Sequence, residues 1–531
     1  MLLLGLNPLS NNAQKILIRG VNWIGDAVLT LPAIKSIRHA FPESHIALLV
    51  KPWVSDLFKE NRDIDEIILY DDCHRGIRGR MRLSRELRAK KFDTAILLQN
   101  AFDAALITWL AGIPKRIGYK RDGRGLLLTD AVPITHEILE QHQVNYYLDL
   151  LNSAGIKASA TEPYIPISEP ERTWARNHLS SSFSDSTTPL IGINPGAAYG
   201  SAKRWLPERF AELIIKIFTE INGRVIIFGG ESETEIANEI ITEINRLKIK
   251  LKIETSPSSL LIMSGKTDLR ELASLISECD AFITNDSGPM HMASALFVPV
   301  IAIFGSTSPV RTGPFGQIHK IISTDIPCSP CMKRVCPEEH LRCMTDITAQ
   351  EVFTAVSEVL PVNRAVFLDK DGTMIEDKNY LNSFDDLVIM RGAKSSLKKL
   401  KGAGFKLICV TNQSGIARGI VDRKFVIDSN AYLQRELSLD DSYYCPHHPD
   451  EKCSCRKPEP VMLLKAGNKH KIHLKSSYVI GDKESDVMLA KNAGAKGILL
   501  SSTPLFEDSR ASFIAGDLND AVKWILENEN T

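Results

Sequence analysis

Uninterrupted runs of Val, Ile and Leu recur along this chain, and no other feature constrains its fold as strongly. Each run leads into a glycine-containing turn and then into a segment with helical periodicity. Such runs are typical of parallel β-strands in sheets that helices cover on both faces. The runs fall into three sets. The first set lies at 15–20, 45–50 and 94–100, and the second at 189–196, 224–230, 281–286 and 300–305. The third set lies at 365–369, 406–412 and 477–482. The sequence therefore predicts an α/β protein with three sheets.

The chain length and the joins between these sets indicate three domains. At 531 residues the chain is too long for one hydrophobic core, and ~3 domains of about 170 residues are expected. Segments rich in Pro, Ser and Thr near 160–188, and LPVN at 360–363, are typical of joins. We predict domains at 1–170, 171–360 and 361–531. The first two would form a two-lobed enzyme with a cleft, and the third a separate catalytic domain.

Charge and hydropathy indicate which partners and which cellular location to expect. Lys and Arg (64) balance Asp and Glu (64), so no overall field points to a nucleic-acid partner. No apolar run approaches the ~20 residues of a membrane span, and the start lacks the features of a secretory signal, so a cytoplasmic protein is expected. Two basic stretches, 75–91 and 114–125, are either solvated surface or a contact site for an anionic partner, such as a phosphorylated lipid or a membrane headgroup layer.

Charged and polar side chains follow the strands of the third set. FLDKDG brings Asp369 and Asp371 to a strand end, VTNQSG brings Thr411, and IGDKESD brings Asp482. Lys457 lies in the RKP segment between them. Ligands of open α/β sheets bind beyond the carboxyl ends of the strands. An Asp-x-Asp pair in that place can supply an attacking carboxylate and a second group that passes a proton.

This order of motifs resembles the haloacid dehalogenase superfamily of phosphatases. The resemblance implies that Asp369 forms an aspartyl phosphate, that Asp371 protonates the leaving group and then activates water, and that Thr411 and Lys457 hold the phosphoryl oxygens. It also implies Mg²⁺ bound by the carboxylates of Asp369 and Asp482 and the carbonyl of Asp371. The short intervals between the motifs leave no room for a large cap domain.

A compact metal-binding pattern lies in the third domain, in YYCPHHPDEKCSCRKPEP. Cys445, His447, Cys453 and Cys455 give C-x-H-x₅-C-x-C, a Cys₃His set suited to a structural, tetrahedral Zn²⁺. Such an ion would stiffen a short loop over the site and aim Arg456 and Lys457 at the substrate. The residues expected to bind the phosphatase substrate are Asn412 and Arg456.

Together with DKDGTMIEDKNY and TNQSGIARG, the CPHHP…C-x-CRKP pattern resembles one branch of the superfamily over residues 362–505. This branch contains the D-glycero-D-manno-heptose 1,7-bisphosphate phosphatases and the related histidinol-phosphate phosphatases. The zinc motif by itself does not distinguish between these two substrates.

The first two sets of strands carry three further motifs. NWIGDAVLTLPAIKSI places Asp26 at the mouth of a helix, as a cap or as a base. NPGAAYGSAKRW places Lys203 after a Gly- and Ala-rich turn, which would make a cradle for a diphosphate. ITNDSGPMHMASAL places Asp286 at a strand end and opens a helix that bears His291, whose first N–H groups would point at an anion.

With FGGESETE and GKTDL, these motifs resemble the heptosyltransferase family of lipopolysaccharide inner-core synthesis over residues 14–358, particularly its heptosyltransferase II branch. The resemblance implies a GT-B fold of two Rossmann-like lobes, with the acceptor on the first and ADP-heptose on the second. It implies that Asp26 deprotonates the acceptor hydroxyl for a single inverting displacement and that Lys203 stabilises the departing diphosphate. The other donor-binding residues it implies are Glu233 at the ribose, Thr267 at the adenine, Asp286 at the heptose, Ser287 and Gly288 at the phosphate, and His291.

The two resemblances together imply a bifunctional enzyme. One part would hydrolyse the 7-phosphate of heptose 1,7-bisphosphate, and the other would transfer heptose from ADP-heptose to a heptosylated Kdo₂–lipid A at the inner face of the cytoplasmic membrane. The fusion context favours heptose bisphosphate over histidinol phosphate. Two alternatives stay open: the third domain is a non-catalytic zinc scaffold, or the first half resembles heptosyltransferase I.

Four further cysteines cluster in CSPCMKRVCPEEHLRC. Cys328, Cys331, Cys336 and Cys343 give C-x₂-C-x₄-C-x₆-C, whose intervals are irregular. Without an export signal, a reducing compartment is expected, where clustered thiols suggest a metal before disulfides. Three interpretations remain: a zinc or iron–sulfur site, unliganded thiols, or disulfides. Neither implied reaction calls for these residues.

Overall fold

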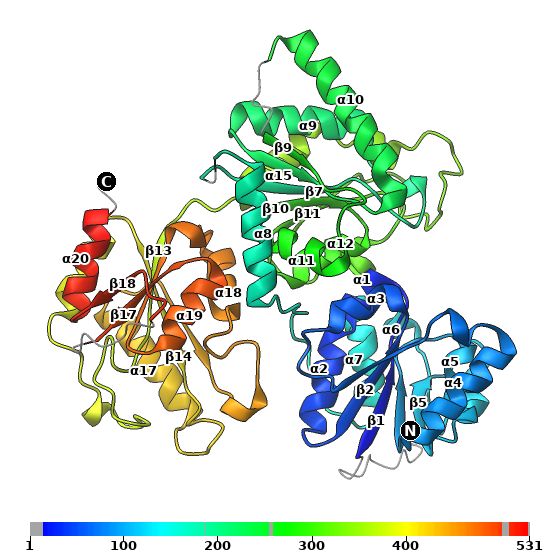
Figure 1. The fold of residues 1–531 in the computed structure, drawn as a ribbon, viewed down its shortest axis with the longest axis horizontal. Coiled ribbons are helices and arrows are strands. Elements are labelled where there is room, and N and C mark those ends of the chain that lie inside the picture. The colour runs from blue at the N-terminus through cyan, green and yellow to red at the C-terminus, as the bar shows by residue number, and fades with distance from the viewer. Residues whose placement is uncertain (1–13, 186, 254–258, 502–508, 529–531) are drawn as a thin grey trace. The chain divides into compact units, whose positions relative to one another are not determined.

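The computed structural model describes residues 14–185, 187–253, 259–501 and 509–528 (Figure 1). Its contacts divide the chain into two compact units, Met1–Val359 and Leu360–Thr531. No helix in these described ranges is long and apolar enough to cross a membrane.

The first unit contains two six-stranded parallel sheets. The first sheet has the order β3 (Glu66–Leu69), β2 (His45–Val50), β1 (Lys15–Arg19), β4 (Thr94–Leu97), β5 (Lys115–Tyr119), β6 (Asp130–Val132). The second has the order β12 (Lys320–Ser323), β11 (Val300–Phe304), β10 (Ala281–Asn285), β7 (Leu190–Asn194), β8 (Arg224–Ile227), β9 (Leu260–Ile262). Each sheet thus has the doubly wound Rossmann order, in which the first and fourth strands lie side by side.

The second unit repeats this plan with one sheet. Its order is β15 (Asp441–Cys445), β14 (Lys406–Asn412), β13 (Ala365–Leu368), β16 (Tyr478–Gly481), β17 (Lys496–Leu500), β18 (Phe513–Ala515). Neighbouring strands pair in parallel, as between β13 and β16. The expectation of three parallel α/β sheets is confirmed.

Helices connect the strands and bury their apolar faces against the sheets. The first sheet is served by α1 (Ile24–Leu29), α2 (Leu31–Ala40), α3 (Pro52–Ser55), α4 (Gly76–Lys90), α5 (Phe102–Leu110), α6 (His136–Glu140) and α7 (Gln143–Ser153). The second is served by α8 (Glu169–Ser182), α9 (Pro207–Glu220), α10 (Thr234–Leu251), α11 (Leu269–Ser277), α12 (Gly288–Ala295), α13 (Pro309–Thr312), α14 (Arg342–Thr345) and α15 (Ala349–Val359). The third is served by α16 (Ala393–Gly402), α17 (Arg423–Glu436), α18 (Val461–His470), α19 (Glu484–Ala493) and α20 (Leu518–Asn528).

The central strands are buried throughout, which explains their uninterrupted apolar sequences. All residues of β7, β10 and β13 are buried. In β9, by contrast, every residue keeps some exposure, because this strand lies at the edge of its sheet. The buried strands bring their carboxyl ends to one edge of each sheet, and this edge carries the polar motifs.

Candidate active sites and metal centre

A cluster of carboxylates surrounds one lysine at the carboxyl edge of the third sheet. Asp369 directly follows β13, Asp482 directly follows β16, and Asp486 lies in the first turn of α19. Carboxylate oxygens of these three residues lie within 4.8 Å of one another. The Nζ atom of Lys457 is 2.8 Å from Oδ1 of Asp369 and 2.6 Å from Oδ1 of Asp486. The buried lysine therefore offsets part of the negative charge of this cluster.

The pKa values of the cluster reflect this crowding. Burial opposes the charge of Lys457, but Asp369 and Asp486 outweigh it and hold the lysine pKa above its usual value. Burial, together with the charge of Asp369, raises the pKa of Asp486 to about 6 against the opposing effect of Lys457. Burial and Asp369 also raise the pKa of Asp371. Lys370 opposes the rise at Asp371, and Lys483 has the same effect on Asp482. The four acids still outnumber these lysines and Lys457, so the site favours a further cation.

The donor atoms present fit a hard divalent cation. Oδ1 of Asp482 is buried and makes no hydrogen bond to any described residue, as expected of an oxygen that is held ready for a metal. Gly372, at φ +81°, brings the backbone of the Asp-x-Asp loop against the carboxylate of Asp482, where a Cβ would collide. In the sequence, Asp486 lies one helical turn after Asp482 in GD-x-x-x-D, but only Asp482 of these two was predicted to bind the metal.

A glutamine that sequence reasoning missed orients the second aspartate of the pair. Nε2 of Gln413 donates to Oδ2 of Asp371 at 2.9 Å and to Oγ1 of Thr411 at 3.0 Å. The side chain of Asn412 binds the backbone of Lys457 instead, accepting from its N–H at 3.0 Å and donating to its carbonyl at 3.4 Å. Asn412 therefore positions Lys457. Contact between Asn412 and a substrate stays a prediction.

The Cys₃His residues form a second metal-sized cluster in the same unit. The ligand atoms of Cys445, His447, Cys453 and Cys455 lie within 4.8 Å of one another. Cys445 and Cys453 are 3.4 Å apart at Sγ, and Cys453 and Cys455 are 3.6 Å apart. A tetrahedral zinc with bonds of about 2.3 Å to sulfur needs edges of roughly 3.8 Å, so this donor set fits Zn²⁺. Arg456, which follows directly, has a buried Nη1 without a hydrogen bond to any described residue.

In the first unit, α1 of the first lobe meets α12 of the second at their opening turns. A Cβ on Gly25 would lie 2.7 Å from Cδ2 of His291, and a Cβ on Gly288 would lie 3.1 Å from Cβ of Ile24. Both glycines therefore permit the close approach. The N-cap of α1 is Trp23 and Asp26 lies within the first turn, so Asp26 is not the helix cap.

Charged groups of both lobes converge at this contact. Burial raises the pKa of Asp26 to about 6, the charge of Asp286 adds to the rise, and Lys203 opposes it. Nζ of Lys203 pairs with Oδ2 of Asp286 at 2.5 Å, and Thr307 donates to the same oxygen at 2.7 Å. Burial lowers the pKa of His291 to about 4, so its ring is neutral at pH 7.

The other predicted donor-site residues lie on neighbouring loops. The hydroxyl of Ser287 bonds that of Thr284 at 2.9 Å and lies at the start of α12. Glu233 accepts from the N–H of Gly230 at 2.9 Å, and its carboxylate covers Gly196, where a Cβ would collide with it. Thr267 precedes Asp268, the N-cap of α11, and no described contact joins Thr267 to the other residues of this group.

The two basic stretches differ in structure. The first forms α4, with exposed arginines such as Arg78 and Arg85. In the second, Arg124 is buried, and its guanidinium donates to the carbonyl of Tyr119 at 2.9 Å. Arg116 likewise donates to the carbonyl of Leu127 at 2.7 Å. These two arginines of the second stretch hold loops together and are not free for an anionic partner.

A further cation, missed by sequence reasoning, lies at the carboxyl edge of the first sheet. Lys51 directly follows β2, and its Nζ lies 3.6 Å from the ring centroid of Tyr70. The neighbouring Trp53 is 53% exposed, and Trp23 is 66% exposed. This edge therefore combines positive charge with exposed aromatic surface.

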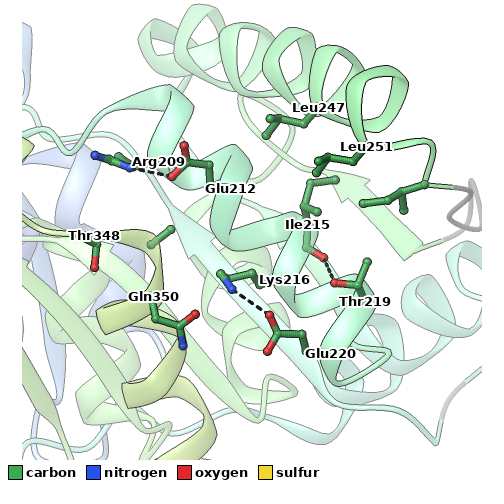
Figure 2. Close-up of a pocket in the computed structure, with 12 residues that line it drawn as sticks. Arg209, Glu212, Ile215, Lys216, Thr219, Glu220, Leu247, Leu251, Thr348 and Gln350 are labelled. Atoms are coloured by element: carbon green, nitrogen blue, oxygen red, sulfur yellow. Dashed lines mark hydrogen bonds and ion pairs between the residues drawn. The ribbon is translucent and has the colours of Figure 1, made fainter.

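A cavity of about 430 Å³ lies elsewhere in the first unit, between α9, α10 and α15 (Figure 2). Its apolar lining includes Ile215, and its charged lining residues are paired, Arg209 with Glu212 at 2.9 Å and Lys216 with Glu220 at 2.9 Å. None of the predicted catalytic or donor-site residues lines it. The volume of a cavity alone therefore does not identify a reaction site in this unit.

Comparison with known proteins matches this division of the chain. The model of glycosyltransferase family 9 (heptosyltransferase) matches residues 80–342, and a HAD-hydrolase-like model matches residues 454–519. Lipopolysaccharide heptosyltransferase 2 of Escherichia coli is 30% identical over 65% of this chain and 99% of its own length. The D-glycero-beta-D-manno-heptose-1,7-bisphosphate 7-phosphatase of Helicobacter pylori is 38% identical over 32% of this chain and 99% of its own length. The chain belongs to the heptosyltransferase family, fused to a haloacid-dehalogenase-type phosphatase.

A solved structure supports the fold of the heptosyltransferase unit. E. coli ADP-heptose lps heptosyltransferase II aligns with a TM-score of 0.55 and 28% identity, over 65% of this chain and 98% of that one. The two sheets of Met1–Val359 are therefore the two lobes of a GT-B-like fold, and the contact of α1 with α12 joins one lobe to the other.

Replacing Asp26 of the heptosyltransferase unit by Asn should change how stability depends on pH. Because the folded-state pKa of about 6 lies above the ordinary 3.8, folded protein holds this proton more tightly than the unfolded chain. The wild type therefore loses stability as pH rises between these two values. At about pH 7.5, Asp26→Asn should raise the free energy of unfolding by about 1–2 kcal/mol, less than the full shift because the carboxylate keeps some solvent.

Urea unfolding of the full chain, followed by circular dichroism, measures this difference. At about pH 2.5 the two proteins should be equally stable, because Asp26 is protonated in both states. Asp122→Asn, in an exposed turn, is the matched control and should have no such effect. If Asp26→Asn were less stable than the wild type at about pH 7.5, the raised pKa of Asp26 would be contradicted.

Proposed function

We propose that this protein is a bifunctional enzyme of lipopolysaccharide inner-core synthesis. Residues 1–170 would bind the acceptor, a heptosylated Kdo₂–lipid A, and residues 171–360 would bind ADP-heptose. Residues 361–531 would hydrolyse the 7-phosphate of D-glycero-D-manno-heptose 1,7-bisphosphate. The convergence of Asp26 from one lobe on Lys203 and Asp286 from the other carries the transferase proposal, and the names of the two relatives support the substrates.

In the transferase reaction, Asp26 would act as the general base. A pKa of about 6 leaves it ionised at pH 7 yet more basic than an ordinary aspartate, which suits removal of a hydroxyl proton. The acceptor oxygen would attack the anomeric carbon as the bond to the diphosphate breaks. Lys203, now paired with Asp286, would turn to the diphosphate, and the N–H groups at the start of α12 would add positive potential.

The acceptor would lie along the carboxyl edge of the first sheet. Lys51 supplies a cation there, α4 supplies exposed arginines, and Trp53 and Trp23 supply apolar surface. This combination suits a phosphorylated glycolipid at the inner face of the cytoplasmic membrane, where the enzyme would associate peripherally.

In the phosphatase reaction, Asp369 would attack the phosphorus to form an aspartyl phosphate. Asp371, whose pKa is raised by burial, would give its proton to the leaving alkoxide and then take one from the attacking water. Lys457 and Thr411 would hold the phosphoryl oxygens, and Arg456 would contact the substrate. Mg²⁺ held by Asp369, Asp482 and the carbonyl of Asp371, with Asp486 beside them, would supply the missing positive charge.

The Cys₃His group would hold a structural Zn²⁺. Its last member, Cys455, lies two residues before Lys457, so a fixed zinc loop would fix the lysine that pairs with Asp369. Zinc bound there would take no part in the chemical steps.

Substitution of one carboxylate in each unit should separate the two activities. In the full chain, Asp26→Asn should lower kcat for heptose transfer by about 100- to 10,000-fold, the usual contribution of a general base. Asp369→Asn should abolish phosphate release, because it removes the nucleophile. ADP release and phosphate release measure the two reactions, and each variant is the control for the other. Loss of both activities in either variant would contradict two independent sites.

Lys51→Ala should weaken binding of the acceptor without affecting the donor. We expect KM for the acceptor to rise about tenfold, equivalent to one charge-assisted contact of ~1.4 kcal/mol, with KM for ADP-heptose unchanged. Lys250→Ala, on the exposed end of α10, is the control. Equal changes in both KM values would argue against an acceptor site at this edge.

A comparison of two substrates on the full chain tests the phosphatase assignment. With Mg²⁺ present, heptose 1,7-bisphosphate should be hydrolysed with a higher kcat/KM than histidinol phosphate. The reverse preference would assign the unit to the histidinol-phosphate branch. No turnover of either, with zinc retained, would favour a non-catalytic scaffold.

A further inference from the structure

Neither proposed reaction uses the four cysteines that follow β12, the last of which lies in α14, yet these residues line a common cavity. Cys328, Cys331, Cys336 and Cys343 surround a space of about 20 Å³ together with His340. All ten cysteines of the chain are free thiols in the structure, so the disulfide interpretation does not describe it. The cavity lies in the heptosyltransferase unit, and the zinc cluster described above belongs to the other unit.

The size and the lining of the cavity restrict what it can hold. A cavity of roughly 10–15 Å³ accommodates one water-sized particle. A space of about 20 Å³ therefore has room for one ion. Four soft thiolate ligands in a tetrahedral arrangement are typical of zinc.

The hydrogen bonds of His340 indicate its part in the cluster. Its Nδ1 accepts from the N–H of Arg342 at 2.9 Å, so in the neutral ring the proton is on Nε2. Nε2 faces Sγ of Cys328 at 3.9 Å. An Nε2–H that donates to a thiolate cannot also ligate a metal, and donors of this kind stabilise the charge on metal-bound sulfur.

We propose that Cys328, Cys331, Cys336 and Cys343 bind one zinc ion through four thiolates, with His340 as an N–H donor to Cys328. Within the described ranges, no three ligand atoms of this set lie within 4.8 Å of one another. The four sulfurs are therefore farther apart than the ligand atoms of the Cys₃His group. Metal binding would therefore draw the thiols inward around the cavity. The ion would make the segment from Cys328 to Cys343 one rigid piece.

This segment supports the loop that carries Lys203. The carbonyl of Arg334 accepts from the N–H of Ala202 at 3.1 Å, and the carbonyl of Met332 accepts from the hydroxyl of Tyr199 at 3.0 Å. Nζ of Lys203 lies 4.5 Å from the ring centroid of Tyr199. The proposed zinc would therefore position Lys203. This consequence rests on the proposed transferase function, whereas the metal site itself does not.

Metal analysis of the full-length protein tests the site directly. The wild type should contain about two zinc ions per chain, one per four-ligand cluster. The double variant Cys328→Ser/Cys331→Ser should contain about one, and so should Cys445→Ser, which alters the other cluster. Cys279→Ala, at a free cysteine outside every group of three or more possible metal ligands in the described residues, should retain the wild-type content. Unchanged zinc in Cys328→Ser/Cys331→Ser would overturn the proposal.

Substitution of His340 tests its assigned part without removing a ligand. His340→Ala should weaken zinc binding at this site by about 10- to 100-fold, the usual effect of losing an outer hydrogen bond. His340→Gln, which keeps an N–H donor, should weaken it less. If His340→Ala removes the zinc as completely as Cys328→Ser/Cys331→Ser, His340 is a ligand and the four-thiolate set is wrong.

Kinetics separate this inference from the proposed function. In Cys328→Ser/Cys331→Ser, KM for ADP-heptose should rise severalfold, and phosphate release should be unchanged. If the wild type transfers no heptose but the double variant still loses one zinc, the proposed function fails and the metal site stands. If zinc is lost and KM for ADP-heptose is unchanged, the positioning of Lys203 is wrong.

Discussion

Each candidate reaction site of this protein depends on one lysine with little exposure, held beside aspartates. Lys457 bridges Asp369 and Asp486 in one unit, and Lys203 pairs with Asp286 in the other. Removing one partner of such a buried pair usually costs about 3–5 kcal/mol, because an uncompensated charge stays behind. The lysines therefore offset the negative charge of carboxylates that lie close together in places with little solvent.

Much of the fold could be predicted from the sequence because the central strands are buried on both faces. Their runs of Val, Ile and Leu need no partner information to be recognised, and ten of them were predicted at the observed places. The strands that were missed are mostly short, polar or at sheet edges. KRIGY of β5 carries two charged residues, and the three residues of β18 lie at the end of their sheet. Such strands form because a neighbouring strand presents unpaired backbone groups.

The candidate sites could be predicted where a motif directly follows a strand, as for Asp369 and Asp482. Residues whose importance comes only from tertiary proximity were missed, among them Gln413 and Lys51. Two arginines of the second basic stretch, Arg116 and Arg124, were misjudged for the same reason. Sequence shows the charge of Arg124 but not the loop carbonyls that bind its guanidinium. Composition reports how many charges a segment has, and folding decides which of them face solvent.

The join between the units has a consequence for the cell. Only residues 360–364 separate the end of α15 from the start of β13, and each unit has hydrophobic clusters of its own. Translation of one message therefore yields the two folded parts in a fixed one-to-one ratio. A change in the amount of the chain alters the amounts of both units together. The ratio of the two activities therefore depends on the turnover number of each unit and not on gene dosage.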